Sequence, residues 1–187
     1  MSNRSKWIWG GLALATISAA LTVAAFQVPP AYHYEEKVDI IAQQRMVFVF
    51  IGELKRWPHW TKWAARNPEM KHEYSDPSWG VGATHNWKSF WSGSAKVTQF
   101  TRDIHMAYEV TVAGYEPSYW QFKLGPAPRQ GTTVVWIANG QYPENRFERL
   151  IEYVMLWRLQ GDIRKGLERL KKHAELHEAY DVKGAWE

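Results

Sequence analysis

The chain has 187 residues, of which 45% are hydrophobic and 22% are charged, a composition typical of one folded domain with an accessory segment and unlike that of a disordered chain. Its formal net charge is +4, and Arg4 and Lys6 account for two of these charges, so the remaining +2 excludes a strongly basic surface for nucleic acid. The absence of cysteine excludes thiol nucleophiles, thiolate metal sites and disulfides.

The first segment, Trp7 to Phe26, is apolar and carries no charge over twenty residues. A helix of that length can cross about 30 Å of hydrocarbon, so the segment predicts a transmembrane anchor. Arg4 and Lys6 precede it, and Trp7 and Trp9 stand where aromatic residues hold a membrane interface. The positive-inside rule then predicts a cytoplasmic N-terminus and a domain that faces outward, on the periplasmic or extracellular side.

A cleaved signal peptide is the alternative interpretation of this segment. It ends in Val23-Ala24-Ala25, a small-residue pattern that a signal peptidase accepts. We favour the retained anchor because the apolar run is longer than the roughly 7–15 residues of a signal peptide. Under both interpretations the domain is exported. Val28-Pro29-Pro30 forms a stiff spacer, so we divide the chain into residues 1–30 (anchor or signal segment and spacer), 31–180 (domain) and 181–187 (tail).

The domain begins with a predicted strand from Tyr32 to Ile41, in which apolar and polar residues alternate. The apolar run from Met46 to Ile51 could be a buried strand, but the apolar positions between Val47 and Leu54 follow helical spacing, and we predict a helix. Trp57 to Asp76 is rich in Pro, Trp and Asn and predicts loop and short turns.

Four or five segments of strand length follow Gly80 and Gly82, separated by Gly-, Pro- or polar-rich breaks. They are Ala83 to Phe90, Ser94 to Thr101, Ile104 to Ala113, Ser118 to Leu124 and Thr132 to Asn139. Their spacing is typical of an antiparallel meander. The clearest alternation sets Ile104, Met106 and Tyr108 against polar neighbours, which predicts one apolar and one wet face.

A long C-terminal helix is predicted from Asn145 onward, because Asn145 can cap it and Glu148 stands three residues later. Its first part has four apolar residues on one face: Phe147, Leu150, Ile151 and Val154. Gly161-Asp162 predicts a break or kink. The apolar stripe then resumes at Ile163, Leu167, Leu170 and Ala174.

This order of elements indicates the α+β class. A curved antiparallel sheet must cover its apolar face, and the long C-terminal helix is the amphipathic element available to do so. A sheet bent around one helix leaves a cavity where the facing side chains do not meet. We therefore expect the functional site between the sheet and this helix.

Several short motifs occur in a specific order and spacing. They are Trp57-Pro58-His59-Trp60-Thr61-Lys62-Trp63, Asn67-Pro68-Glu69-Met70, Gly80-Val81-Gly82-Ala83, Trp87, Gly93, Gly131-Thr132-Thr133-Val134-Val135-Trp136 and Gly166-Leu167-Glu168-Arg169-Leu170-Lys171. Together they resemble the polyketide cyclase/dehydrase-like branch of the START-like (SRPBCC) superfamily, from about residue 32 to about residue 178.

The resemblance implies a helix-grip (START/Bet v-like) fold of order β-α-α-β-β-β-β-β-β-α with an apolar pocket. It also implies kinship with proteins that bind lipids, polyketides or other hydrophobic molecules. Two departures bear on local strand geometry: Ala95 stands where a second glycine is common, and Thr101-Arg102-Asp103 lacks a proline usual near that turn.

Twelve tryptophans are far above ordinary usage, and such rings fill a core, line a pocket or sit at a membrane interface. Seven residues are candidates for ligand binding: Trp87, Met106, Tyr108, Trp120, Phe122, Trp136 and Val154. As pocket walls, the rings would offer flat apolar surface and indole N–H donors. The alternative is that they only fill a core. We expect Trp57, Trp60 and Trp63 to pack the loop beneath the sheet.

The histidines give further candidates. His173 and His177 are four apart on a helix and could bind a metal, but only nearby glutamates suggest a third ligand, and we interpret them as solvated surface. His85 and His105 lie in predicted strands, where a buried imidazole could act as a general base. However, His105 falls on the polar face, and nothing pairs His85 with a carboxylate. We assign no catalytic and no metal-binding residue.

The sequence thus predicts a membrane-anchored binding or transport protein for a hydrophobic small molecule or lipid, with no metal or redox cofactor and no nucleic-acid partner. One alternative is a cyclase- or dehydratase-like enzyme, which titratable groups converging in the cavity would indicate. Another is a module that binds carbohydrate or a protein partner through exposed tryptophans, which a flat aromatic patch would indicate. The oligomeric state is left open.

Overall fold

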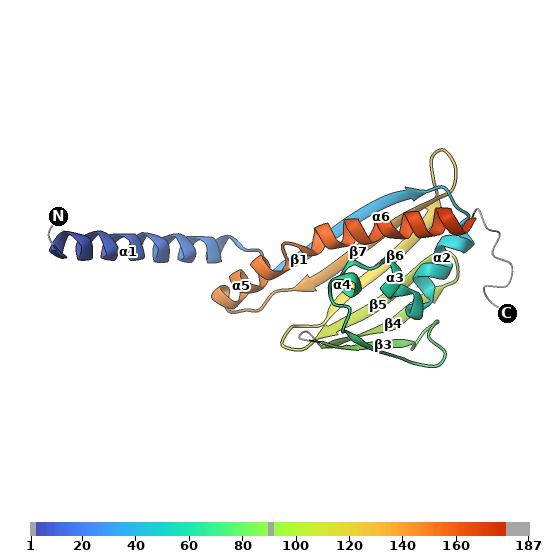
Figure 1. The fold of residues 1–187 in the computed structure, drawn as a ribbon, viewed down its shortest axis with the longest axis horizontal. Coiled ribbons are helices and arrows are strands. Elements are labelled where there is room, and N and C mark those ends of the chain that lie inside the picture. The colour runs from blue at the N-terminus through green and yellow to red at the C-terminus, as the bar shows by residue number, and fades with distance from the viewer. Residues whose placement is uncertain (1–2, 90–91, 179–187) are drawn as a thin grey trace.

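The structure, a computed structural model, describes residues 3–89 and 92–178. A curved seven-stranded sheet carries helix α6 across one face, and helix α1 extends away from the domain (Figure 1). In chain order the elements are α1 (Asn3–Gln27), β1 (Ala31–Ile40), α2 (Gln44–Gly52), the 3₁₀ helix η1 (Leu54–Arg56), α3 (Trp57–Trp60), α4 (Lys62–Arg66), β2 (Lys71–Tyr74), β3 (Thr84–Lys88), β4 (Gly93–Thr101), β5 (His105–Val112), β6 (Ser118–Pro126), β7 (Thr132–Gln141), α5 (Arg146–Leu156) and α6 (Leu159–Glu178).

The strands follow the order β1-β7-β6-β5-β4-β3-β2, and every neighbouring pair is antiparallel. The register sets Trp136 of β7 opposite Phe122 of β6, and Trp120 of β6 opposite Tyr108 of β5. Directly opposed residues point to the same face of a sheet, so these large side chains gather on the face that α6 covers. The α+β class and the helix-grip architecture are thereby confirmed.

Strand β5 shows both the strength and the limit of the alternation signal. Met106 and Tyr108 are buried as expected, whereas Ile104 is 53% exposed. The strand begins only at His105, so Ile104 lies in the turn that joins β4 to β5 and does not take part in the alternation.

Helix α2 confirms the helical interpretation of the apolar run at residues 46–51, and all its residues from Val47 to Gly52 are buried. The loop expected from Trp57 to Asp76 is wrong in part, because α3, α4 and β2 lie within it. In β2 the half-buried residues are His72 and Tyr74, while their neighbours are exposed. The inward side chains of this edge strand are polar or amphipathic, so hydropathy alone does not show its alternation.

Helix α6 packs on the sheet through the predicted stripe of Ile163, Leu167, Leu170 and Ala174, all of which are buried. The break expected at Gly161-Asp162 lies earlier, between α5 and α6. The Asp162 N–H donates to the Arg158 carbonyl oxygen at 3.0 Å and so continues the helix. Asp162 also stands in the first turn of α6, where the helix dipole favours a negative charge.

Helix α5 begins at the predicted cap, where the Asn145 side chain accepts hydrogen bonds from the N–H groups of Phe147 and Glu148. Its apolar residues share a face as predicted, but that face is turned away from the sheet. Val154 is 57% exposed and does not join the buried core. The buried residue of α5 is instead Glu152.

Among the described residues, α1 is the one helix long and apolar enough to cross a membrane, over Trp9–Gln27. Ala25 and Val28 are buried where the helix meets the domain. Helix α1 is therefore a candidate membrane span or signal sequence. The side chains of Arg4, Lys6, Trp7 and His177 and the tail at 181–187 lie outside the described residues.

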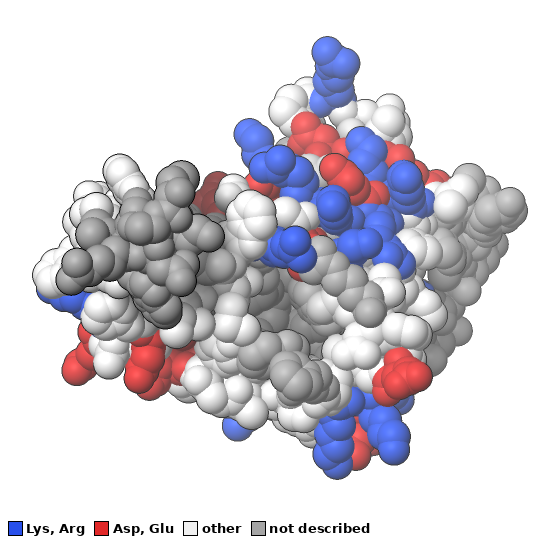
Figure 2. All heavy atoms as spheres, turned by 60° about the vertical axis from the view of Figure 1, so that its left-hand side comes forward, with Lys and Arg blue, Asp and Glu red and all other residues white. Residues whose placement is uncertain are grey.

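The surface charge of the domain is mixed in sign. Figure 2 shows Lys and Arg side chains gathered in the upper part of the view, with Asp and Glu side chains among them. Arg164 of α6 binds Glu36 of β1 at 2.7 Å, and this hydrogen-bonded pair lowers the pKa of the Glu36 carboxyl. The pair also ties α6 to the first strand.

Gly131, in the turn between β6 and β7, should not tolerate a side chain. Its φ is +94°, and an added Cβ would lie 2.0 Å from the carbonyl oxygen of Ile40. We expect Gly131→Ala to lower the free energy of unfolding by about 2–3 kcal/mol. Urea unfolding of the full chain in mild detergent measures this value.

Gly114→Ala is the matched control for this prediction. Gly114 also has a positive φ, +86°, but an added Cβ there would meet nothing within 4 Å. We expect Gly114→Ala to lower the free energy of unfolding by about 1 kcal/mol, through backbone strain alone. Equal losses in the two variants would contradict the steric clash at Gly131.

Candidate functional site

The sheet brings five of the seven predicted ligand-binding residues together in one buried cluster: Met106, Tyr108, Trp120, Phe122 and Trp136. They come from the neighbouring strands β5, β6 and β7 and point toward α6. Trp87 of β3 is partly buried and packs against this cluster, whereas Val154 is exposed on α5. We call the cluster and the rings packed on it the aromatic interior.

The rings of the aromatic interior contact one another closely. The centroid of Phe122 lies 4.7 Å from that of Trp136 and 5.8 Å from that of Tyr108. Trp57 and Trp60 of α3 also belong to this group, with centroid distances of 4.9 Å to Tyr108 and 5.5 Å to Trp136, respectively. Tilted and edge contacts at these separations are favourable. The described rings therefore pack on one another between the sheet and the helices.

Four indole N–H groups of the aromatic interior already donate hydrogen bonds within the protein. Trp57 and Trp60 donate to the carbonyl oxygens of Ile51 and Phe50, at 2.8 and 3.0 Å. Trp120 donates to Ser118 Oγ and Trp136 to the Tyr108 hydroxyl, both at 2.9 Å. Of the predicted pocket-wall residues, Trp120 and Trp136 therefore direct their N–H groups to protein acceptors in this structure.

Trp63 marks the border of the aromatic interior. It stands on α4, a helix of five residues, and is only partly buried. Its ring lies 5.6 Å from that of Trp136 and 6.3 Å from that of Trp120. A row of ring contacts thus runs from fully buried Phe122 through Trp136 to a side chain that reaches the surface.

Three tyrosines lie near one another at the start of β1 and the end of β7. The hydroxyls of Tyr34 and Tyr142 are 3.3 Å apart, and the ring of Tyr32 packs on both residues, at 5.3 and 5.2 Å. Burial raises the pKa of Tyr32 and of Tyr142. These phenols therefore stay protonated at neutral pH and can donate a hydrogen bond.

Glu152 of α5 adds a carboxyl group to this end of the domain. It is only 7% exposed, and burial, followed by the charge of Glu116, raises its pKa. Its charge in turn contributes to the raised pKa of Tyr32. A carboxyl with a raised pKa can act as a general acid or base where a bound molecule reaches it. The pattern of α5 does not mark Glu152 as buried, because the apolar residues of this helix form its other face.

A second polar pair lies at the β2–β3 edge, where His72 Nδ1 is 2.9 Å from His85 Nε2. Burial, followed by the nearby His72, lowers the pKa of His85 to about 4, so its imidazole is neutral at physiological pH. The buried Nδ1 of His85 has no hydrogen-bond partner among the described residues. The ring of Tyr74 stacks on His85 at 4.6 Å. No carboxylate takes part in the hydrogen bond that the structure shows for His85.

The remaining candidates lie elsewhere. His105 Nε2 lies 3.2 Å from the Gln121 side-chain oxygen, and His173 Nε2 lies 3.1 Å from the His59 carbonyl oxygen. The described part of the chain has no group of three or more His, Asp or Glu side chains suited to a metal ion. A hollow of about 460 Å³ lies on the other face of the sheet, lined by residues that include Lys37, Lys123 and Thr133, and contains none of the predicted site residues.

Comparison with solved structures shows the same fold at low sequence identity. A protein from Mesorhizobium loti is 14% identical, with a TM-score of 0.57 over 81% of this chain and 100% of its own. A protein from Chromobacterium violaceum is 10% identical, with a TM-score of 0.56 over 77% of this chain and 98% of its own. The Aha1 dimer from Colwellia psychrerythraea is 16% identical, with a TM-score of 0.54 over 78% and 97%.

Comparison with curated proteins finds no match. Residues 32–175 match the sequence profile of the family described as polyketide cyclase/dehydrase and lipid transport. The matched range runs from β1 into α6 and so includes the entire sheet and the aromatic interior. The chain therefore belongs to the polyketide cyclase/dehydrase and lipid transport family of START-like proteins.

Proposed function

We propose that the chain is a membrane-anchored binding or transport protein for a hydrophobic small molecule or lipid, held between the sheet and α6. The observation that carries the proposal is the row of ring contacts from buried Phe122 through Trp136 to partly exposed Trp63. In this proposal residues 1–30 are the anchor and spacer, residues 31–180 the binding domain and residues 181–187 a tail. The family description, which includes lipid transport, supports the same class of ligand.

In this proposal a ligand enters by moving one ring, because the described rings pack closely on one another. Trp63 is the ring best placed to move, since it stands on a short helix at the border and is only partly buried. A ligand that enters beneath the displaced Trp63 ring, against Trp120 and Trp136, would be covered by that ring and would bury its own apolar surface, at about 25 cal/mol per Å². The indoles of Trp57 and Trp60 are held by backbone carbonyls and would form the fixed floor.

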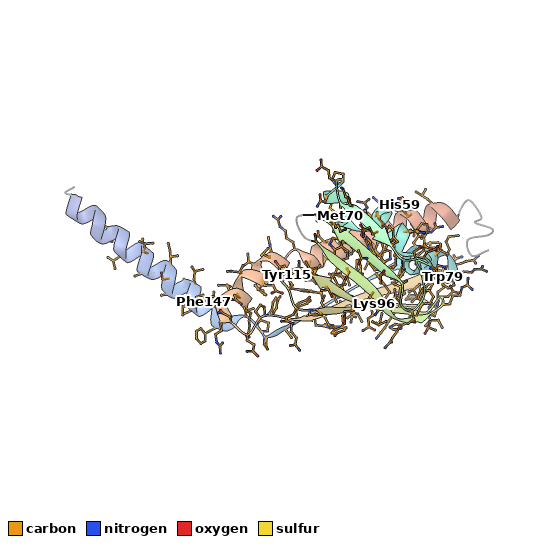
Figure 3. The ribbon with its side chains drawn as sticks, turned by 90° about the horizontal axis from the view of Figure 1, so that it is seen from below. His59, Met70, Trp79, Lys96, Tyr115 and Phe147 are labelled. Atoms are coloured by element: carbon orange, nitrogen blue, oxygen red, sulfur yellow. The ribbon has the colours of Figure 1, made fainter. Side chains whose placement is uncertain are left out.

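An enzyme of the cyclase or dehydratase type is the second candidate. The observation that favours it is the buried carboxyl of Glu152, whose raised pKa and whose charge effect on Tyr32 place two titratable groups at one end of the domain. A module that binds through exposed tryptophans has less support. Trp79 lies at the end of the domain far from α1 (Figure 3), whereas Trp157 directly follows α5, so these two exposed rings do not share a patch.

Mass spectrometry of the full chain, purified from its own membrane, tests the binding proposal. We expect the wild type to retain an apolar molecule and Trp63→Ala to retain several-fold less, because the ligand loses the ring that covers it. Trp79→Ala is the matched control, since Trp79 is 47% exposed and lies at the end of the domain far from α1 (Figure 3). It should retain as much as the wild type.

A wild-type chain without any retained apolar molecule, or equal retention by Trp63→Ala, would contradict binding at this site. The same preparation distinguishes the enzyme. If the retained molecule changes chemically on incubation and Glu152→Gln stops the change, the protein acts as a catalyst and not only as a carrier.

A further inference from the structure

Helix α5 has the reverse of the arrangement expected for a helix on a water-exposed surface. Phe147, Ile151 and Val154 are 56%, 61% and 57% exposed, whereas Glu152, on the opposite face, is 7% exposed. A surface helix ordinarily turns its apolar side inward and its charges outward. The apolar face of α5 therefore lacks a cover within the described part of the domain.

This face adjoins the end of α1. The guanidinium of Arg146, the first residue of α5, lies 4.3 Å from the centre of the Phe26 ring. The Tyr142 N–H donates to the Pro30 carbonyl oxygen at 2.9 Å and ties the segment before α5 to the spacer. Figures 1 and 3 both show α5, with Phe147 labelled in Figure 3, where the domain meets α1. If α1 crosses a bilayer, α5 lies at its surface.

The residues around the apolar face suit a lipid–water boundary. Trp157 follows α5 and is 64% exposed, and tryptophan is enriched where a bilayer meets water. Arg146 stands at the start of α5 and Arg158 just after its end, and such long side chains can reach phosphate groups.

We propose that α5 binds the surface of the phospholipid bilayer beside α1, with Phe147, Ile151, Val154 and Met155 placed in the boundary between headgroups and acyl chains. The proposal rests on the membrane-anchored part of the proposed function, and not on its ligand. A second copy of the chain is a poorer occupant. One face of an eleven-residue helix is small beside the roughly 800 Å² that each partner buries in a stable protein interface.

This docking would bring one end of the aromatic interior close to the bilayer. The Tyr115 hydroxyl, in the turn between β5 and β6, donates to Met155 Sδ of α5 at 3.4 Å. Strand β6 then begins at Ser118, which accepts the indole N–H of Trp120. Trp120 contacts Trp63 in turn. A lipid could thus pass between the membrane and the interior over a short path.

The absence of cysteine allows a direct test, because each single-cysteine variant carries one fluorophore. Ile151→Cys and Val154→Cys are labelled with a polarity-sensitive dye, and the full chain is reconstituted in vesicles of phosphatidylcholine and phosphatidylglycerol. Ile104→Cys is the matched control, since Ile104 is 53% exposed in the β4–β5 turn, at the other end of β5 from the turn that contacts α5.

We expect blue-shifted emission at positions 151 and 154, with quenching by lipid-borne nitroxide several-fold stronger than at position 104. An interfacial helix places its apolar face about 5–10 Å below the headgroups, within reach of such a quencher. Adding Ile151→Glu to the Val154→Cys chain should shift the emission of the label to that of the dye in water. The near-ultraviolet circular dichroism should stay unchanged.

Two outcomes would overturn the proposal. Quenching by aqueous iodide at positions 151 and 154, as strong as at position 104, would show that the face is open to water. Shielding from both quenchers, together with energy transfer between labelled copies, would show that a second chain covers it. Neither result depends on whether the interior retains an apolar molecule, so failure here is distinct from failure of the binding proposal.

Discussion

Replacing Trp136 with alanine is expected to lower the free energy of unfolding by about 3–5 kcal/mol, as for other large buried aromatic residues. Trp136 is fully buried in the middle of strand β7, and its ring contacts those of Phe122 and Trp60. Its removal leaves a cavity and also leaves the buried Tyr108 hydroxyl without the indole donor. Urea unfolding of the full chain in mild detergent, followed by circular dichroism, measures the loss.

Trp157→Ala is the control for this result, because the Trp157 side chain is largely exposed. The free energy of unfolding of Trp157→Ala should lie within about 0.5 kcal/mol of the wild-type value. Trp136→Phe keeps a ring but removes the N–H donor. Its free energy of unfolding should fall between those of Trp136→Ala and Trp157→Ala. A loss below about 1 kcal/mol in Trp136→Ala would contradict a tightly packed interior, since truncation there would then leave no unfilled space.

Acidification from about pH 6.5 to about pH 4 is expected to lower the free energy of unfolding by about 3 kcal/mol through His85. Burial and the nearby His72 lower the pKa of His85 from 6.5 to about 4 in the folded chain. Between these values the unfolded chain binds a proton that the folded chain does not bind, so stability falls as the pH falls. Above about pH 6.5 both states are neutral at His85, and its contribution no longer changes with pH.

His85→Gln isolates this effect, because glutamine does not titrate in the range. The hydrogen-bonded Glu36 also loses its contribution in acid, since Arg164 lowers the pKa of its carboxyl. That loss is common to both chains and cancels in the comparison. Urea unfolding at several pH values should therefore show that the free energy of unfolding depends more steeply on pH in the wild type than in His85→Gln. The same slope in both chains between pH 6.5 and about pH 4.5 would contradict a depressed pKa of His85.

Much of the fold follows from periodic patterns in the sequence. The alternation around Met106 and Tyr108 places both residues inside, and the stripe from Ile163 to Ala174 is the face by which α6 covers the sheet. These signals are reliable because each concerns a long element with one face fully buried. For the same reason, the five predicted residues that meet in the aromatic interior could be identified from the sequence.

The remainder depends on contacts that no local pattern shows. The apolar stripe of α5 is a correct reading of its periodicity, but periodicity does not say which neighbour an amphipathic helix faces. For this reason the sequence does not indicate that Glu152 is buried or that Val154 is exposed. In β2 the inward residue Tyr74 stacks on His85, and His72 forms a hydrogen bond with His85, so both contacts are made across the sheet and not along the chain.

The engaged indole N–H groups bear on what kind of molecule the protein could select. Because Trp57, Trp60, Trp120 and Trp136 direct their donors to protein acceptors, a molecule in contact with them would meet mainly ring faces and edges. Such surfaces discriminate by length and width and hardly by functional group. A carrier built in this way would accept chemically different compounds of similar shape.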